Sequence, residues 1–366
     1  MDVKRIFAGM AAALLAAVLF FSSRVNALSA QKAIVMDAQT GRVLYEKAAD
    51  SRSLIASTTK IMTALIVCEQ CNVLDRMRIP KEAVGIEGSS MYLREGEVLT
   101  IQELLYGLML HSGNDAAVAL AIYCGGTVEG FAQLMNDKAH RLGMTGTHFE
   151  NPNGLDSPGH YSTARDMAVL SAYAMENPIF AKTVSTKTVS VTGRRLSNHN
   201  KLLWRFEGAD GVKTGFTKAA GRILVSSALR QGRRLIAVTM NDPNDWRDHE
   251  AMLENGFSGF AVQQIIAKGD CLGYTEVVGG QEGVVHLYAD ADFFYALAGD
   301  EKPEILLNGP GFVYAPVAQG QDAGFAYVCL GEKTVGKIPL IYGETIEQTE
   351  TPKRSFWDKL FGKEDT

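Results

Sequence analysis

The sequence predicts a mixed α/β (α+β) fold in which helices flank an antiparallel sheet, followed by a small C-terminal all-β domain. Apolar residues at helical spacing recur between residues 57 and 175 and again over 246–260. Between residues 188 and 240, strand-like runs are joined by short turns, and such turns connect antiparallel neighbours. After residue 267 the strand-like runs become short and alternate with Gly, Asp and Pro.

Length and composition limit the class of protein. The chain has 366 residues, and 46% of them are hydrophobic, which is enough for the cores of one large or two modest domains. A formal net charge of −5 and a pI near 5.9 give no basic surface of the kind that nucleic acid requires. We therefore expect no nucleic-acid partner.

The N-terminus has the layout of a secretory signal peptide, assigned to residues 1–30. Lys4 and Arg5 precede an apolar run over residues 6–21, and small residues allow cleavage after Ala27 or after Ala30. The alternative is an uncleaved membrane anchor, for which the apolar run is short. Both interpretations place the folded part of the chain outside the cytoplasm.

The first folded domain is assigned to residues 31–264. Five helices are predicted in it. One begins at Ser57, and a second begins after Thr100, where Glu103 has capping-box spacing. The other three cover residues 131–142, 163–175 and 246–260. Its predicted strands are a hairpin over residues 32–46 and the runs 189–191, 194–197, 212–216, 222–229 and 235–240.

A second domain is assigned to residues 268–345, where short strands alternate with turn residues as in a small β-sandwich. It contains no catalytic grouping, so we expect a spacer or docking module. Residues 346–366 are predicted to form a linker and an amphipathic tail, because Phe356, Trp357, Leu360 and Phe361 share one helix face beside basic residues. Such a tail binds a membrane surface; the alternative is a frayed, solvated end.

Ser57 and Lys60 form the first chemical motif. At the start of a helix they lie one turn apart on the same side. A serine hydroxyl becomes a nucleophile when a base takes its proton, and burial together with the positive helix N-terminus favours the neutral amine of Lys60. The same spacing at Ser29 and Lys32 runs into a predicted strand, so we discount it.

Two further motifs follow in order. Ser112-Gly113-Asn114 comes after an apolar run, and Lys213-Thr214-Gly215 ends a strand-like stretch. Lys-Thr occurs at three other places in the chain, where valine follows instead of glycine. In order, the three motifs resemble the active-site signature of the penicillin-recognising serine enzymes.

The wider sequence resembles the serine-type D-alanyl-D-alanine carboxypeptidases of peptidase family S11, the low-molecular-weight penicillin-binding proteins. The similar segments include residues 37–45, 151–155, 159–168 and 211–217, and the likeness covers roughly residues 31–345. The resemblance implies a β-lactamase/transpeptidase fold and removal of the terminal D-alanine from peptidoglycan stem peptides ending in D-Ala-D-Ala. It also implies β-lactams as covalent inhibitors, with no cofactor and no metal.

The resemblance assigns catalytic roles to four residues. Ser57 attacks the carbonyl between two D-alanines, and Lys60 takes its proton. Ser112 relays a proton to the leaving D-alanine, while Asn114 holds Lys60 and the substrate amide by hydrogen bonds.

It assigns substrate binding to the third motif. Lys213 attracts the terminal carboxylate and Thr214 hydrogen-bonds it, while Gly215 leaves the strand edge clear for the peptide. The backbone N–H groups of Ser57 and Phe216 are the implied oxyanion donors.

Three histidines lie near these motifs. His111 and His160 are expected to be structural. His199 stands where some relatives have an arginine that contacts the substrate carboxylate, and Arg222 or Lys218 is the candidate replacement. The five cysteines form no disulfide framework, and we expect buried free thiols, with Cys124 among those scattered singly.

Three other functions share this chemistry or fold. A class A β-lactamase requires a glutamate for deacylation, and neither Glu150 nor Glu176 has the expected context. A DD-endopeptidase cutting cross-links has the same chemistry and stays open. A catalytically silent wall-binding protein is disfavoured because every catalytic side chain is retained.

Overall fold

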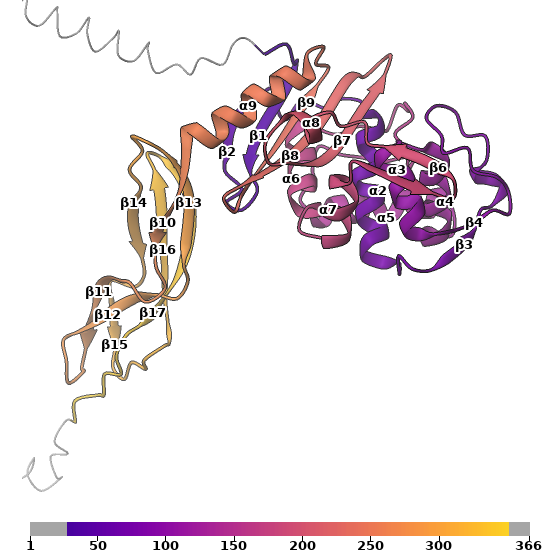
Figure 1. Cartoon of the computed structure of the whole chain (residues 1–366). Coiled ribbons are helices and arrows are strands. Elements are labelled where there is room, and N and C mark those ends of the chain that lie inside the picture. Colours follow the sequence, from indigo (N-terminus) through magenta and orange to yellow (C-terminus); the bar gives the residue numbers. More distant parts are fainter. Residues whose placement is uncertain (1–27, 351–366) are drawn as a thin grey trace, which may run out of the picture. The chain divides into compact units, whose positions relative to one another are not determined.

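The computed structural model describes residues 28–350. These residues belong to two compact units, the first ending at Gly259 and the second beginning at Phe260. Figure 1 labels their helices and strands. The predicted signal peptide up to residue 27 and the predicted amphipathic tail after residue 350 lie outside the described residues.

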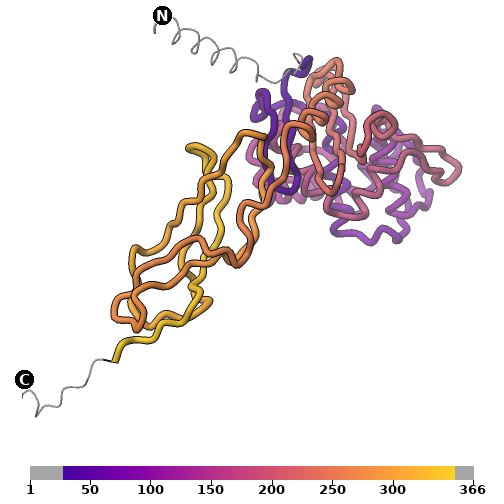
Figure 2. Tube along the Cα trace, turned by 60° about the vertical axis from the view of Figure 1, so that its left-hand side comes forward, coloured from indigo at the N-terminus to yellow at the C-terminus, as the bar shows by residue number. Residues whose placement is uncertain are grey.

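The first unit is built around a five-stranded antiparallel sheet with the order β2-β1-β9-β8-β7. Its strands are β1 (Lys32–Asp37), β2 (Val43–Lys47), β7 (Ala209–Thr217), β8 (Gly221–Arg230) and β9 (Arg233–Met240). The early hairpin joins this sheet because β1 pairs with β9, with Lys32 opposite Met240. Figure 2 shows these distant parts of the chain side by side. The predicted antiparallel sheet is confirmed, and it includes the first hairpin.

The two faces of the sheet pack against different helices, as strand β1 illustrates. Ala33 and Val35 point into a cluster with Met252 and Leu253 of α9 (Asp245–Gly259). Ile34 and Met36 of the same strand belong to the larger core on the other face. Side chains alternate across a strand, so one short apolar run serves both cores.

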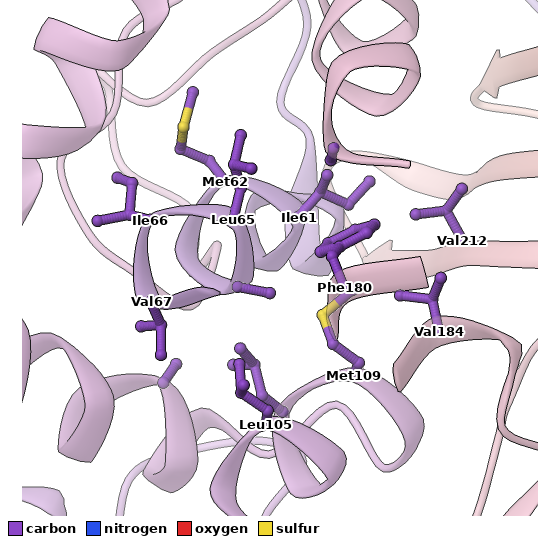
Figure 3. Packing of buried hydrophobic residues seen from close by; sticks show 14 of the residues in the cluster. Ile61, Met62, Leu65, Ile66, Val67, Leu105, Met109, Phe180, Val184 and Val212 are labelled. Atoms are coloured by element: carbon purple, nitrogen blue, oxygen red, sulfur yellow. The ribbon is translucent and has the colours of Figure 1, made fainter. Parts of the chain in front are cut away.

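Helix α2 (Lys60–Gln70) runs through the larger core and is buried on all sides from Lys60 to Cys68. Figure 3 shows its apolar side chains against Leu105, Phe180 and Val212. The other helices of this core are α3 (Ile101–Leu110), α4 (Asn114–Gly125), α5 (Val128–Arg141), α6 (Ala164–Ala174) and α7 (Pro178–Ser185). Within residues 28–350, no single helix has the length and apolar composition of a membrane span, although α4 and α5, bent by 82°, pass that test together.

Short elements complete the first unit. They are the 3₁₀ helices η1 (Ala56–Thr59) and η2 (Lys81–Ala83), the one-turn helix α8 (Leu202–Arg205), and the strand pairs β3 (Arg76–Arg78) with β4 (Val98–Thr100) and β5 (Thr188–Val191) with β6 (Arg194–Ser197). The predicted capping box at Thr100 and Glu103 is confirmed. Helix α4 was missed because its apolar residues surround the helix and leave no polar face.

The second unit is all β, as predicted. Its six-stranded sheet has the order β14-β16-β17-β12-β11-β15, and β10 pairs separately with β13. The strands are β10 (Phe260–Ile266), β11 (Cys271–Val278), β12 (Val284–Ala289), β13 (Phe293–Ala298), β14 (Glu304–Asn308), β15 (Phe312–Tyr314), β16 (Asp322–Leu330) and β17 (Lys333–Tyr342). All pairs are antiparallel except β11 with β15.

The boundaries of this unit differ from those assigned from sequence. It begins at Phe260, not at residue 268, because β10 pairs along its length with β13. It also continues past residue 345: Ile346 is buried and exchanges backbone hydrogen bonds with Val317. The composition change near residue 267 marks only the turn between β10 and β11, where Asp270 N donates to Ala267 O.

All five cysteines are free thiols, as expected, but three of them are not buried. Cys271 is exposed, and Cys71 and Cys124 are only half-buried. A side-chain hydrogen bond joins Cys71 to Cys124 and lowers the pKa of the Cys124 thiol. Cys124 is therefore not isolated, because α2 and α4 bring it beside Cys71.

Candidate active site

Ser57 lies in the turn η1, directly before α2. Ala56 adopts a positive φ of 45°, a conformation that residues other than Gly, Asn and Asp seldom adopt. Lys60 is the first residue of α2, and its Nζ lies 3.0 Å from Ser57 Oγ. The structure thus brings the nucleophile candidate and the base candidate into hydrogen-bond contact.

The amine of Lys60 is completely buried, with 0% of the residue exposed. Besides Ser57 it donates to Asn114 Oδ1 at 2.6 Å and to the backbone oxygen of Asn153 at 2.5 Å. Burial, followed by the charge of Lys213, holds the pKa of Lys60 well below its usual 10.5, and the carboxylate of Asp115 opposes this shift only in part. A lysine in this setting can accept a proton near neutral pH.

The second motif forms the turn between α3 and α4. Ser112 has a positive φ of 62°, and Asn114 begins α4. Asn114 is fixed on both sides, since its amide Nδ2 donates to Glu87 O at 2.5 Å while its Oδ1 accepts from Lys60. Strained backbone at Ser112 and Ala56 is typical of functional sites, where the surrounding structure offsets its cost.

The third motif lies on β7, an edge strand of the sheet. Lys213 is buried, and burial lowers its pKa to about 7. Its Nζ donates to the backbone oxygen of Thr214 at 3.0 Å. Phe216, by contrast, is 64% exposed.

Gly215 has a second role besides the one implied by the resemblance. A Cβ at this position would lie 3.2 Å from Ile55 O and 3.3 Å from Ser57 N. Because such contacts are tighter than ordinary packing, the missing side chain lets β7 run close to the nucleophile turn. The glycine thus sets the distance between strand and turn, besides leaving the edge free of a side chain.

The loop over residues 151–155 closes the site from another side. A Cβ on Gly154 would lie 1.8 Å from Ala56 O, and Thr63 Oγ1 donates to Pro152 O at 2.6 Å. The loop therefore holds the nucleophile turn and supplies the Asn153 oxygen to Lys60.

A cavity of about 350 Å³ opens over Ser57. It is lined by Ser57, Ser89, Ser112, His199, Lys201, Thr214, Gly215, Phe216, Arg222, Ile223, Asp245 and Trp246. Five of the eight residues singled out from sequence line it, whereas Lys60, Asn114 and Lys213 are buried and do not line it. Glu150 and Glu176 are not among the lining residues.

The histidines near the motifs differ in position. His199 lines the cavity beside the ring of His111, with 5.4 Å between the ring centroids. Burial, then the charge of Lys213, lowers the pKa of His199 to about 4, so it is neutral at pH 7. His160 is buried, and its Nε2 lies 2.8 Å from Thr59 Oγ1, in keeping with a structural role.

Sequence reasoning missed several residues of the site. Asn153 acts through its backbone, so its side-chain chemistry gave no signal beyond the Asn-Pro-Asn-Gly pattern of its loop. Asp245 and Trp246 reach the cavity from the start of α9. Across residues 28–350, no group of three or more His, Cys, Asp and Glu side chains could hold a metal ion.

Comparison with known families identifies both units. Residues 20–244 match the family Peptidase S11, described as D-alanyl-D-alanine carboxypeptidase. Residues 260–348 match the family of the penicillin-binding protein 5 C-terminal domain.

Several relatives are similar to this chain along most of their length. D-alanyl-D-alanine carboxypeptidase DacD of Escherichia coli (strain K12) is 34% identical over 346 residues, covering 89% of each chain. DacF of Bacillus subtilis (strain 168) is 32% identical over 337 residues, covering 87% of this chain and 86% of the relative.

Solved structures agree with this similarity. Penicillin-binding protein 5 from Haemophilus influenzae aligns with a TM-score of 0.76 and 30% identity, covering 88% of this chain and 98% of the other. A mutant of the Streptomyces K15 DD-transpeptidase aligns with a TM-score of 0.61 and 36% identity, covering 63% of this chain and 98% of the other.

Proposed function

Because this chain belongs to the Peptidase S11 family of D-alanyl-D-alanine carboxypeptidases, we propose that it removes the terminal D-alanine of peptidoglycan stem peptides through an acyl-enzyme on Ser57. It is a serine-type carboxypeptidase, and peptidoglycan ending in D-Ala-D-Ala is the substrate class. The observation that carries the mechanism is the 3.0 Å hydrogen bond between Lys60 Nζ and Ser57 Oγ.

The acylation step follows from this contact. Neutral Lys60 accepts the proton of Ser57 Oγ while the oxygen forms a bond to the carbonyl carbon between the two D-alanines. Asn114 Oδ1 and Asn153 O keep the amine pointed at the serine, so proton transfer needs no rearrangement.

The leaving group needs a proton as the C–N bond breaks. Ser112 lines the cavity beside Ser57 and relays the proton to the departing D-alanine. Thr214, which lines the same cavity, and Lys213 behind it bind the terminal carboxylate. Water then hydrolyses the ester and restores Ser57.

Negative charge on the carbonyl oxygen is stabilised by backbone N–H groups of Ser57 and Phe216. The close approach of Gly215 to Ser57 N brings these two parts of the backbone together. The same arrangement accepts a β-lactam ring, which acylates Ser57, and we propose β-lactams as covalent inhibitors.

One experiment tests this function directly. The purified protein is incubated with a muropeptide ending in D-Ala-D-Ala, and free D-alanine is measured. In parallel, labelled penicillin is added and the modified peptide is identified by mass spectrometry. D-Alanine release and label on Ser57 are expected; label on another residue, or undiminished labelling of Ser57→Ala, would contradict the assignment.

Cleavage of cross-links is the second candidate, since a DD-endopeptidase breaks the same type of bond. The free edge of β7 and the open cavity favour a peptide substrate. They are compatible both with a single D-alanine and with a larger, cross-linked peptide as the leaving group. A cross-linked muropeptide dimer offered beside the monomer distinguishes the two activities. A silent wall-binding protein would release nothing from either.

Two terminal segments of the sequence support a proposal for the location of the protein. We propose export by the signal peptide and attachment of the C-terminal tail to the outer face of the cytoplasmic membrane. The spacing of apolar and basic residues after Pro352 supports the tail assignment.

A further inference from the structure

Two pairs of side chains join helices α2 and α4, one pair at each end of the helices. Lys60 and Asn114 are the first residues of α2 and α4, and Lys60 Nζ donates to Asn114 Oδ1 at 2.6 Å. Cys71 directly follows α2, Cys124 is the last residue but one of α4, and a side-chain hydrogen bond joins their thiols. The two helices therefore run side by side in the same direction, with their ends matched.

Two further contacts hold the C-terminal ends of these helices together. Cys124 Sγ donates to Gln70 Oε1 at 3.7 Å, and Tyr123 OH donates to Asp75 Oδ2 at 3.0 Å. Gln70 directly precedes Cys71, and Tyr123 directly precedes Cys124. Three side-chain contacts thus link the same two short segments, which keeps the two thiols beside each other.

Both thiols of this pair are free and half-buried, so a small reagent can reach them. Sulfur atoms in hydrogen-bond contact need only a small shift of their side chains to reach the disulfide bond length of about 2.05 Å. Cys68 lies one turn earlier on α2, but it is buried, and burial raises the pKa of its thiol to about 12. The geometry therefore favours the pair between the helices over a pair within α2.

The reaction begins at Cys124, because the hydrogen bond from Cys71 lowers the pKa of the Cys124 thiol although burial opposes this. The Cys124 thiolate attacks one sulfur of a small disulfide, forms a mixed disulfide and releases the first small thiol. Cys71 loses its proton to water and attacks Cys124 Sγ, which expels the second small thiol. Two electrons pass from the protein to the small disulfide, which becomes two thiols.

We propose that Cys71 and Cys124 form a disulfide that clasps α2 to α4 when the protein meets a low-molecular-weight disulfide. Disulfides persist in the oxidising surroundings of exported proteins, which is where the proposed export places this chain. The bond closes a loop over residues 72–123 and so restricts the unfolded chain. It lies about 16 Å from Lys60 along the 11 residues of α2, and neither cysteine lines the cavity, so the clasp stabilises the helix pair without entering the site.

The test begins with the purified protein, which is incubated with oxidised glutathione and mapped by mass spectrometry without reduction. We expect a cross-link between the peptides of Cys71 and Cys124, with the loss of two hydrogen atoms. The oxidised protein should melt about 5–10 °C above the reduced protein. Penicillin acylation at room temperature should stay within about twofold, because the clasp is remote from Ser57.

Three variants assign the effect to this pair. Cys71→Ser and Cys124→Ser should lose both the cross-link and the rise in melting temperature. Each should acylate like the reduced parent, which shows that the first unit is folded. Cys271→Ser removes an exposed thiol of the second unit and is the matched control, so it should keep the cross-link and the rise.

Three results would overturn the inference. They are thiols that stay free in oxidised glutathione, a cross-link between Cys68 and Cys71 instead, and a cross-link of the expected pair that leaves the melting temperature unchanged. The cross-link is read by mass and the stability by thermal unfolding. Both readouts are independent of D-alanine release, so failure of this inference and failure of the proposed function are distinguishable.

Discussion

Lys60 Nζ and Asn153 O lie 2.5 Å apart although 93 residues separate them in the chain. The contact ties the loop over residues 151–155 to the buried amine that also reaches Ser57. A neutral amine still has protons to donate to Asn153 O and Asn114 Oδ1, and its lone pair can face Ser57 Oγ. The loop therefore sets the direction in which Lys60 accepts a proton.

Acylation should depend on pH through Lys60. The neutral base exists above the pKa of this lysine, which is held well below 10.5, so penicillin acylation should rise with pH and level off well before pH 10.5. Lys60→Arg stays protonated and should lose at least about a hundredfold in rate, the usual worth of a general base. Stopped-flow acylation rates across pH measure both effects.

The exposed Lys182 provides the matched control, and Lys182→Arg should keep the full rate and profile. A Lys60→Arg enzyme with near-normal acylation would show that another group takes the proton.

Alanine substitutions at Gly154 and Gly126 test whether the loop over residues 151–155 must pack closely against the nucleophile turn, with Gly126 as the control. Both have positive φ, 85° and 75°, but a Cβ atom would meet neighbours within 4 Å only at Gly154. Gly126→Ala should cost about 1–2 kcal/mol of unfolding free energy from backbone strain alone. Gly154→Ala adds a clash with Ala56 O and should cost more, roughly 3 kcal/mol or above.

Urea unfolding and acylation rates would be compared for the two variants. Gly126→Ala should acylate normally, whereas Gly154→Ala should be slower because Ser57 is displaced. Equal behaviour of the two variants would mean that the loop does not hold the turn.

His249 should make the first unit sensitive to acid. It is fully buried between Ser226 Oγ at 2.6 Å and Thr239 Oγ1 at 3.0 Å, and burial lowers its pKa to about 3. The unfolded chain, with a histidine pKa near 6.5, binds more protons between pH 6.5 and 3, so stability falls as pH decreases through this window. The loss is on the order of 4 kcal/mol.

His249→Gln keeps polar atoms at the site but cannot be protonated, so it should flatten the decline in melting temperature between pH 6.5 and 4. His140→Gln, at an exposed position, should leave that decline unchanged. If the two variants lose stability with acid in the same way as the parent, His249 is not the group responsible.

The mature N-terminus should begin at Leu28. Leu28 and Ala30 are buried, and Ser29 Oγ donates to Asp242 Oδ1 at 2.5 Å and to Asp248 Oδ2 at 2.9 Å. Cleavage after Ala30 would remove these contacts, so cleavage after Ala27 is favoured. N-terminal sequencing of exported protein distinguishes the sites, and a chain starting at Gln31 would contradict this prediction.

Removing the tail should release the protein from membranes. Mature protein is expected to bind anionic liposomes with an affinity that falls in high salt, because the tail combines apolar and basic side chains. A chain truncated after Thr351 should stay in the supernatant of a sedimentation assay and acylate at the same rate. Equal partitioning of the two forms would exclude the tail as the anchor.

Local sequence determined the features that depend on neighbouring residues. The spacing of Ser57 and Lys60, the capping box at Thr100 and the first hairpin are set by the backbone periods of helix and strand. The order of the three motifs carried the family resemblance. The class of the fold followed from the same periodicities.

Only the tertiary structure decided which distant groups meet. Asn153 O reaches Lys60, Arg222 pairs with Asp245, and β1 enters the sheet beside β9, yet none of these pairs has a spacing that a periodic pattern could reveal. The two members of each pair come from different helices, strands or loops. They come into contact only when these elements pack against the two faces of the sheet. Sequence periodicity sets each element, whereas burial of the shared core brings the elements together and so completes the site.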